Sequence, residues 1–140
     1  MKRCLFLIPL LFSVMFCIIG CEDVIDIDFV NNTGFTLVCD FDLREPLDTL
    51  LHENSPWPNG IEKIDCVIEP HSTHVSRFNK RSFTRLEESG LCYSFYFYDV
   101  DTIKNVSWER IRNENIVIKK VHIYSLNDLE YNYDKVICIP

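Results

Sequence analysis

Short runs of alternating apolar and polar residues, each followed by a turn sequence, constrain the fold of this chain most strongly. Side chains on a β-strand point alternately to its two faces, so a period of two is typical of a half-buried strand. Residues 24–29 read Val-Ile-Asp-Ile-Asp-Phe, and the run at residues 91–98 is the strongest strand pattern in the chain. Comparable patterns predict strands at residues 35–41, 61–69, 73–78, 116–124 and 135–139.

Turn and helix signals lie between these runs. Asn31-Asn32-Thr33-Gly34 is typical of a turn and predicts a hairpin between residues 24–29 and 35–41. Thr84 and Glu87 have the spacing of a capping box, and Gly90 stands where a short helix would end. Further helical turns are expected after Asp101 or Ser107, and after Ser125.

Seven short strands with two or three helical turns predict a mainly β protein, a single immunoglobulin-like antiparallel β-sandwich. On the strand at residues 91–98, the face with Leu91, Tyr93, Phe95 and Phe97 is the better candidate for the core. The alternation slips near Lys119-Lys120, which indicates a bulge or bend in the strand at residues 116–124.

The N-terminus carries the features of an export signal. Lys2 and Arg3 precede an uncharged apolar run that ends at Gly20, the form of a secretory signal peptide. Ile18-Ile19-Gly20-Cys21 resembles the lipobox of bacterial lipoproteins, in which the cysteine thiol receives a diacylglyceryl group and the leader is cut before the cysteine. Two or three acyl chains are needed for durable attachment, because one chain binds a membrane only marginally.

The expected organisation is therefore a signal peptide at residues 1–20, a lipidated cysteine with a short acidic tether at residues 21–23, and one domain at residues 24–140. Without the leader's two basic residues, the chain holds 12 basic and 21 acidic residues, a net charge of −9. A chain this acidic is not expected to bind nucleic acid by electrostatic attraction.

Four cysteines follow Cys21, and no two of them have the spacing of a zinc or thioredoxin-type motif. Cys39 and Cys66 each share strand parity with apolar neighbours, so both are expected to face the core. They are candidates for one disulfide, and the alternative is two small apolar side chains. The remaining two are Cys92 and Cys138.

No nucleophile elbow, phosphate-binding loop or zinc-protease motif is present, so no catalytic residue, metal site or cofactor is predicted. His71 and His74 are too few for a tight metal site. An alternative to a non-enzymatic protein is a small enzyme that acts on envelope glycans with a pair of carboxylates. Its candidate acids are Asp99, Asp101, Glu109 and Asp128.

The second half of the chain carries a family resemblance. An aromatic strand ending in Asp99 is followed by Trp108-Glu-Arg-Ile111, by Tyr124-Ser-Leu-Asn-Asp-Leu129 and by a last strand ending in Pro140. This pattern resembles small uncharacterised lipoproteins of Bacteroides-type bacteria (Bacteroidota), whose usual motifs are W-E-x-I and Y-x-L-x-D-L turns. The chain departs from them at residues 133–135, where those proteins commonly have Asn-Trp. The resemblance implies a source and an architecture, and no activity.

Two modification signals follow from that resemblance. Glu22 and Asp23, directly after Cys21, are similar to the acidic signal that sends such lipoproteins to the cell surface, and a solvated tether is the alternative. Thr49 and Thr102 stand in Asp-Thr-aliphatic tripeptides, which resemble the O-glycosylation signal of these bacteria; both are expected in loops.

These observations favour a lipoprotein anchored in the outer membrane, which works as a non-enzymatic binding module. Its expected partners are the membrane, through the N-terminal lipid, and an unidentified envelope protein or glycan.

Overall fold

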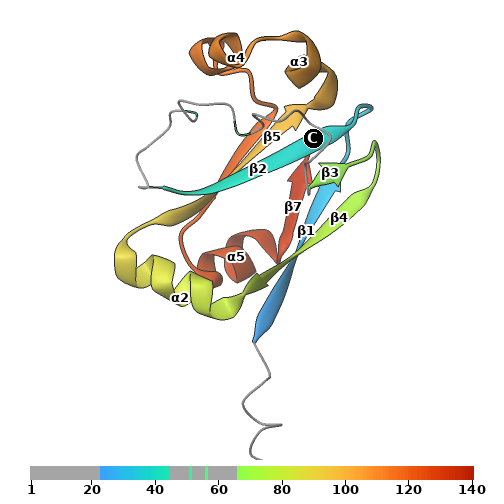
Figure 1. The fold of residues 1–140 in the computed structure, drawn as a ribbon. Coiled ribbons are helices and arrows are strands. Elements are labelled where there is room, and N and C mark those ends of the chain that lie inside the picture. Colours follow the sequence, from blue (N-terminus) through green and yellow to red (C-terminus); the bar gives the residue numbers. More distant parts are fainter. Residues whose placement is uncertain (1–22, 45–50, 52–55, 57–65) are drawn as a thin grey trace, which may run out of the picture.

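Two β-sheets pack face to face in the computed structural model, which describes residues 23–44, Leu51, Pro56 and residues 66–140 (Figure 1). The first sheet has the strand order β4 (Thr73–Asn79), β1 (Val24–Asn31), β7 (Val136–Ile139). The second has the order β3 (Val67–Ile68), β2 (Leu37–Arg44), β5 (Cys92–Asp99), β6 (Lys119–Ile123). The predicted β-sandwich is confirmed, with a strand in each of the seven predicted regions. Of the strand predicted at residues 61–69, residues 61–65 lie outside the described residues, and β3 is Val67–Ile68.

The strand pairing differs from the predicted one in two respects. Strands β1 and β2 are not a hairpin: β1 pairs with β4, and β2 pairs with β3 and β5 in the other sheet. The alternation correctly indicated two strands, but it carries no information on which partner each strand takes. In addition, β1 and β7 run parallel, whereas the other ladders are antiparallel.

Four helices connect the strands in the described part of the chain: α2 (Lys80–Ser89), α3 (Val100–Asn105), α4 (Trp108–Glu114) and α5 (Leu126–Tyr133). Asn79, and not Thr84, caps α2, so this helix begins one turn earlier than predicted; Gly90 ends it in a left-handed conformation, as expected. Ser107 and Ser125 cap α4 and α5, as predicted, and Asp99 caps α3, a further helix that was not predicted.

The main core lies between the two sheets. Ile25, Ile27 and Phe29 of β1 face the other sheet and are almost completely buried. The Phe29 ring lies 5.3 Å from that of Phe95 and 5.4 Å from that of Phe97, both on β5. Helices α2 and α5 complete the core with Phe83, Leu86 and Leu129.

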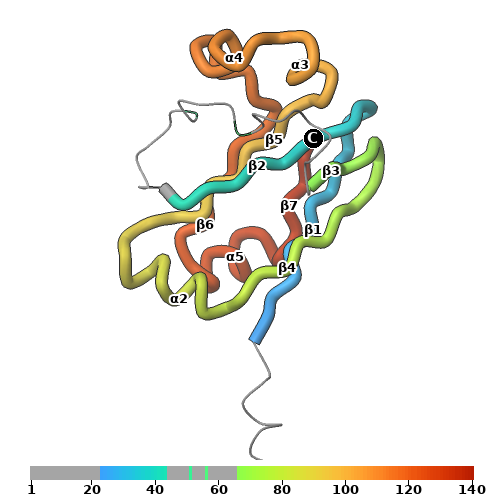
Figure 2. The backbone as a smooth tube through the Cα atoms, viewed as in Figure 1, coloured from blue at the N-terminus to red at the C-terminus, as the bar shows by residue number. Residues whose placement is uncertain are grey.

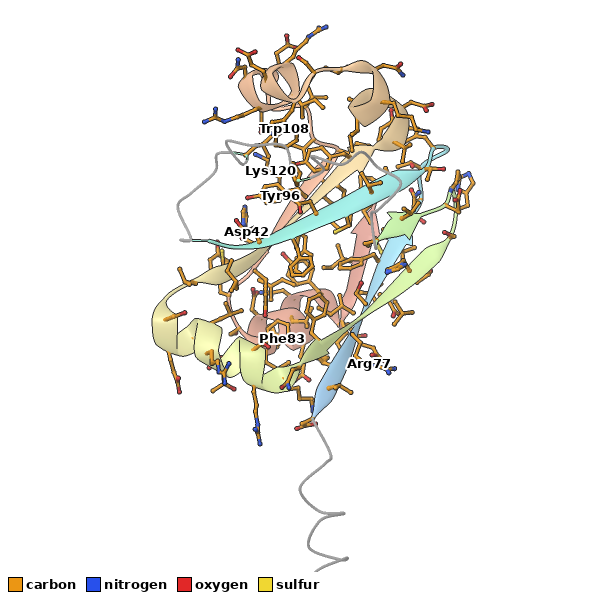
Figure 3. The ribbon with its side chains drawn as sticks, in the orientation of Figure 1. Asp42, Arg77, Phe83, Tyr96, Trp108 and Lys120 are labelled. Atoms are coloured by element: carbon orange, nitrogen blue, oxygen red, sulfur yellow. The ribbon has the colours of Figure 1, made fainter. Side chains whose placement is uncertain are left out.

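A second core covers the opposite face of β5. Tyr96 and Tyr98 are each 1% exposed and pack with Val38, Leu51 and Ile111. In Figure 3, Tyr96 and Trp108 lie on the α4 side of the four-stranded sheet, and Phe83 lies at the other end of the sandwich. The predicted core face of β5 is confirmed, but its other face is buried as well.

The ends of the sandwich are covered by different helices. Helices α2 and α5 lie side by side where β1 begins, and α3 and α4 lie at the far end (Figures 1 and 2). Lys80 fastens the start of β1: its amide donates to the Asp23 carbonyl at 2.8 Å, and its Nζ lies 3.0 Å from Asp23 Oδ1. Within the described residues, no helix has the length and apolar character needed to cross a bilayer.

Candidate functional site

A cavity of about 470 Å³ lies at the end of the sandwich far from the start of β1. Its walls come from three segments that are distant in sequence: the turn after β1, the turn after β3, and the start of α3. The lining residues are Gly34, Phe35, Thr36, Glu69, Pro70, Asp99, Val100, Asp101 and Lys104.

The buried side chain of Asn31 holds two of these walls together. Its Nδ2 donates to the carbonyl of Phe35 at 2.9 Å, and to those of Ile68 and Glu69 at 3.1 and 3.0 Å. Its Oδ1 accepts from the amide of Thr33 at 2.9 Å and from the Thr33 hydroxyl at 2.6 Å. Since Asn31 has no exposed surface, these bonds satisfy an amide group that would otherwise be costly to bury.

The third wall is fixed by the cap of α3. Asp99 accepts hydrogen bonds from the amides of Asp101 and Thr102 at 3.1 and 3.2 Å, the usual arrangement of a helix N-cap. The amide of Val100 donates to the carbonyl of Thr36 at 3.0 Å and so joins this wall to the first. The Thr36 hydroxyl donates to Glu69 Oε2 at 3.0 Å, which links the first wall to the second.

The lining combines an exposed aromatic ring with charged groups. Phe35 is 45% exposed although it is apolar. The carboxylates of Glu69 and Asp101 and the ammonium of Lys104 provide acceptors and donors around it. More of the lining is polar than apolar, so the ring of Phe35 is an apolar contact surface within a polar cavity.

The four carboxylates proposed for catalysis are not brought together. Asp99 and Asp101 line the cavity, but Glu109 lies on α4 and does not. Asp128 lies on α5 at the other end of the sandwich, where its Oδ2 accepts from the amide of Tyr124 at 3.0 Å. Both oxygens of Asp99 accept backbone amides, so this residue acts as a helix cap in the structure.

A polar row on the four-stranded sheet was missed by the sequence reasoning. Asp42, Ser94 and His122 are direct neighbours across β2, β5 and β6, and Ser94 Oγ lies 2.8 Å from His122 Nδ1. A serine beside a histidine is the arrangement of nucleophilic catalysis. Ser94 has no exposed surface, however, so its hydroxyl is out of reach of a substrate and the contact is structural. Only the strand register places these residues together.

The two cysteines predicted to face the core do so. Cys39 is 6% exposed, and Cys66 is half-buried against the same core. Both are free thiols, and the amide of Cys39 donates to the Cys66 carbonyl at 3.0 Å. Burial raises the pKa of Cys39, whereas the hydrogen bond from Cys39 lowers the pKa of Cys66. The predicted disulfide remains a prediction.

One of the two glycosylation candidates can be located. Thr102 lies in α3 and not in a loop, and its hydroxyl donates to Asp99 Oδ2 at 2.9 Å. A glycan on that oxygen would remove the donor from the helix cap. Thr49, the lipobox residues Ile18, Ile19 and Gly20, and the lipidation residue Cys21 lie outside the described residues.

In comparisons with known proteins, the chain matches no protein-family model, no curated protein and no solved structure. In the described part of the chain, no three His, Cys, Asp or Glu side chains gather in a way that could hold a metal ion.

Proposed function

We propose that this protein is a lipoprotein of the Bacteroides type, anchored in the outer membrane through Cys21, and that it works as a non-enzymatic binding module. The cavity between Phe35, Glu69 and Lys104 is its binding site. The partner is an envelope protein or glycan that enters this cavity.

The observation that carries the proposal is the placement of the cavity at the end of β1 opposite to the end where this strand begins. Cys21 precedes Asp23, the first described residue, by two positions. Strand β1 then runs through eight residues to the turn that lines the cavity, a distance of roughly 26 Å at about 3.3 Å per residue. An anchor at one end of β1 therefore presents the cavity at the other end, away from the bilayer.

The chemistry of the cavity supports binding over catalysis. Glu69 accepts from the Thr36 hydroxyl, and Asp99 accepts from the start of α3. Carboxylates committed to such bonds hold the walls of the cavity in place. The exposed ring of Phe35 is, by contrast, well suited to pack against a sugar ring or an apolar side chain of a partner.

The test is co-purification of the tagged, full-length protein from its native envelope, followed by mass spectrometry of the captured proteins and glycans. Phe35→Ala removes the exposed aromatic ring at the cavity. Tyr131→Ala, on α5 at the other end, removes an aromatic ring that is 87% exposed and is the matched control.

We expect Phe35→Ala to reduce the captured partner about tenfold, the effect of losing an interface contact worth about 1.4 kcal/mol. Tyr131→Ala should leave capture unchanged. Equal capture by Phe35→Ala and the unaltered protein, or a loss confined to Tyr131→Ala, would reject the cavity as the binding site. Protease treatment of whole cells then distinguishes display on the surface from a position facing the periplasm.

A further inference from the structure

Cys39 and Cys66 lie opposite each other at the edge of the four-stranded sheet. Strands β2 and β3 are antiparallel, with Leu37 opposite Ile68 and Val38 opposite Val67. Continuing this register by one residue places Cys39 opposite Cys66, and the 3.0 Å bond from the Cys39 amide to the Cys66 carbonyl fits that pairing. Opposed residues that exchange such bonds have Cα atoms about 5.5 Å apart, inside the range that a disulfide spans.

The side chains of Cys39 and Cys66 both face the main core. Cys39 belongs to the main core, and Cys66 packs against that core from the edge. The Cys39 Sγ lies 3.7 Å from the carbonyl oxygen of Asp40. Hydrogen bonding with Cys39 and with Ser76 of β4, in the other sheet, lowers the pKa of Cys66. Both cysteines therefore border the core between the two sheets.

We propose that Cys39 and Cys66 are a disulfide-forming pair in which Cys66 reacts first with an external disulfide and Cys39 closes the bond. This assignment does not depend on the proposed anchor or on the binding cavity. It rests on the strand register, the backbone hydrogen bond between the two residues, their shared core and the difference in their burial.

The order of the two steps follows from access and ionisation. Cys66 is half-buried, and hydrogen bonding with Cys39 and Ser76 lowers the pKa of its thiol, whereas Cys39 is 6% exposed and burial raises its pKa. The thiolate is the attacking form, so the sulfur that is both reachable and more readily ionised reacts first.

The reaction is an exchange with an oxidised thiol–disulfide partner, R–S–S–R, of the protein or small-molecule class. The Cys66 thiolate attacks one sulfur of the partner, which forms a mixed disulfide and releases the first R–S⁻. The Cys39 thiolate then attacks the Cys66 sulfur, which forms the internal disulfide and releases the second R–S⁻. Two electrons pass from the cysteine pair to the partner, and the two protons of the original thiols go to solvent or to the released thiolates.

This disulfide would cross-link β2 to the segment that contains β3, which forms part of the cavity wall. Residue 66 leads directly into β3, and β3 ends at Ile68 and Glu69, whose carbonyls accept from Asn31. Oxidation thus ties the second wall of the cavity to β2 by a covalent bond in addition to its hydrogen bonds.

The test uses the full chain, equilibrated with mixtures of reduced and oxidised glutathione and then alkylated. We expect the oxidised protein to lose two hydrogen atoms in mass and to yield a linked peptide pair containing Cys39 and Cys66. The Cys92→Ser/Cys138→Ser variant should behave in the same way, because Cys92 is buried on β5 and Cys138 is exposed on β7.

A second measurement needs no substitution. Limiting iodoacetamide added to the reduced, folded protein should alkylate Cys66 at least about tenfold faster than Cys39, since the thiolate and access both favour it. Full alkylation of both residues after oxidation, a link that uses Cys92 or Cys138, or faster alkylation of Cys39 would each overturn the proposal.

Discussion

The side-chain amide of Asn31 donates to the backbone carbonyl of Ile68 at 3.1 Å, across 37 positions of sequence. The same nitrogen reaches Phe35 and Glu69, so one buried residue connects the end of β1, the following turn and the end of β3. These three segments belong to both sheets and form two walls of the cavity. The same hydrogen bonds therefore hold the cavity walls in place and stabilise this end of the sandwich.

Replacing Asn31 with Ala should destabilise the protein by about 2–3 kcal/mol, because several buried carbonyls and the Thr33 amide lose their partner at once. Urea unfolding followed by circular dichroism measures the change. Asn32→Ala is the matched control: Asn32 is exposed, and its bond to Ile139 uses the backbone amide, so the change should stay within about 0.5 kcal/mol. Equal effects of the two substitutions would contradict this role of Asn31.

Replacing Gly90 and Gly34 with alanine should change the free energy of unfolding in different ways. Gly90 ends α2 at φ 70° and ψ 14°, a conformation that costs an alanine about 1 kcal/mol. Gly34 has open space around its Cα and no such positive φ, so alanine there should be neutral or should stabilise by about 0.5 kcal/mol through the unfolded chain. Thermal unfolding of both variants measures the difference, and a stabilised Gly90→Ala would show that the left-handed cap is wrong.

The ion pair between β1 and β4 should give one acid-dependent contribution to stability. Arg77 Nε donates to Asp26 Oδ1 at 2.8 Å, and this hydrogen bond lowers the pKa of Asp26 below its ordinary value of 3.8. Because the folded pKa is the lower one, the contribution is fully present above the unfolded pKa and is lost as the pH falls from there through the folded pKa.

Titration of the Asp26 carboxyl by NMR measures this pKa. Arg77→Gln should raise it toward 3.8, whereas Arg110→Gln, which breaks a separate pair with Glu114 on α4, should leave it unchanged. An Asp26 pKa at or above 3.8 in the unaltered protein would show that the pair does not form in solution.

Closing the disulfide between Cys39 and Cys66 should stabilise the sandwich. The cross-link spans 27 positions of sequence, and restricting a loop of that length in the unfolded chain is worth about 3 kcal/mol. Urea unfolding of the oxidised and reduced forms of the same protein gives the difference directly. A lower midpoint for the oxidised form would mean that the bond strains the edge of the sheet.

The sequence contained enough information to predict the elements but not their partners. Alternation of Ile25, Ile27 and Phe29 identifies a half-buried strand whichever strand lies beside it. The turn at residues 32–36 appeared to join a hairpin, yet the bonds of Asn31 to Ile68 and Glu69 direct the chain from one sheet to the other. Such long-range hydrogen bonds leave no local signal in the sequence.

Neither the second core nor the cavity could be predicted from the sequence, for a related reason. Tyr96 and Tyr98 looked like the solvent face of β5, because the pattern could not show that Trp108 and Ile111 would cover them. The cavity is assembled from three turns that are distant in sequence. Asp99 and Asp101 were predicted as candidate acids of an enzyme, and the fold places both at the cavity.

Lipidation of Cys21 is the premise of the proposed function. The direct measurement is metabolic labelling of the full-length protein with a palmitate analogue in its native cells, with the Cys21→Ala and Cys138→Ala variants beside it. We expect label on the unaltered protein and on Cys138→Ala, no label on Cys21→Ala, and a mature chain that begins at residue 21. Label that persists in Cys21→Ala, or an unlabelled mature chain that begins elsewhere, would contradict it.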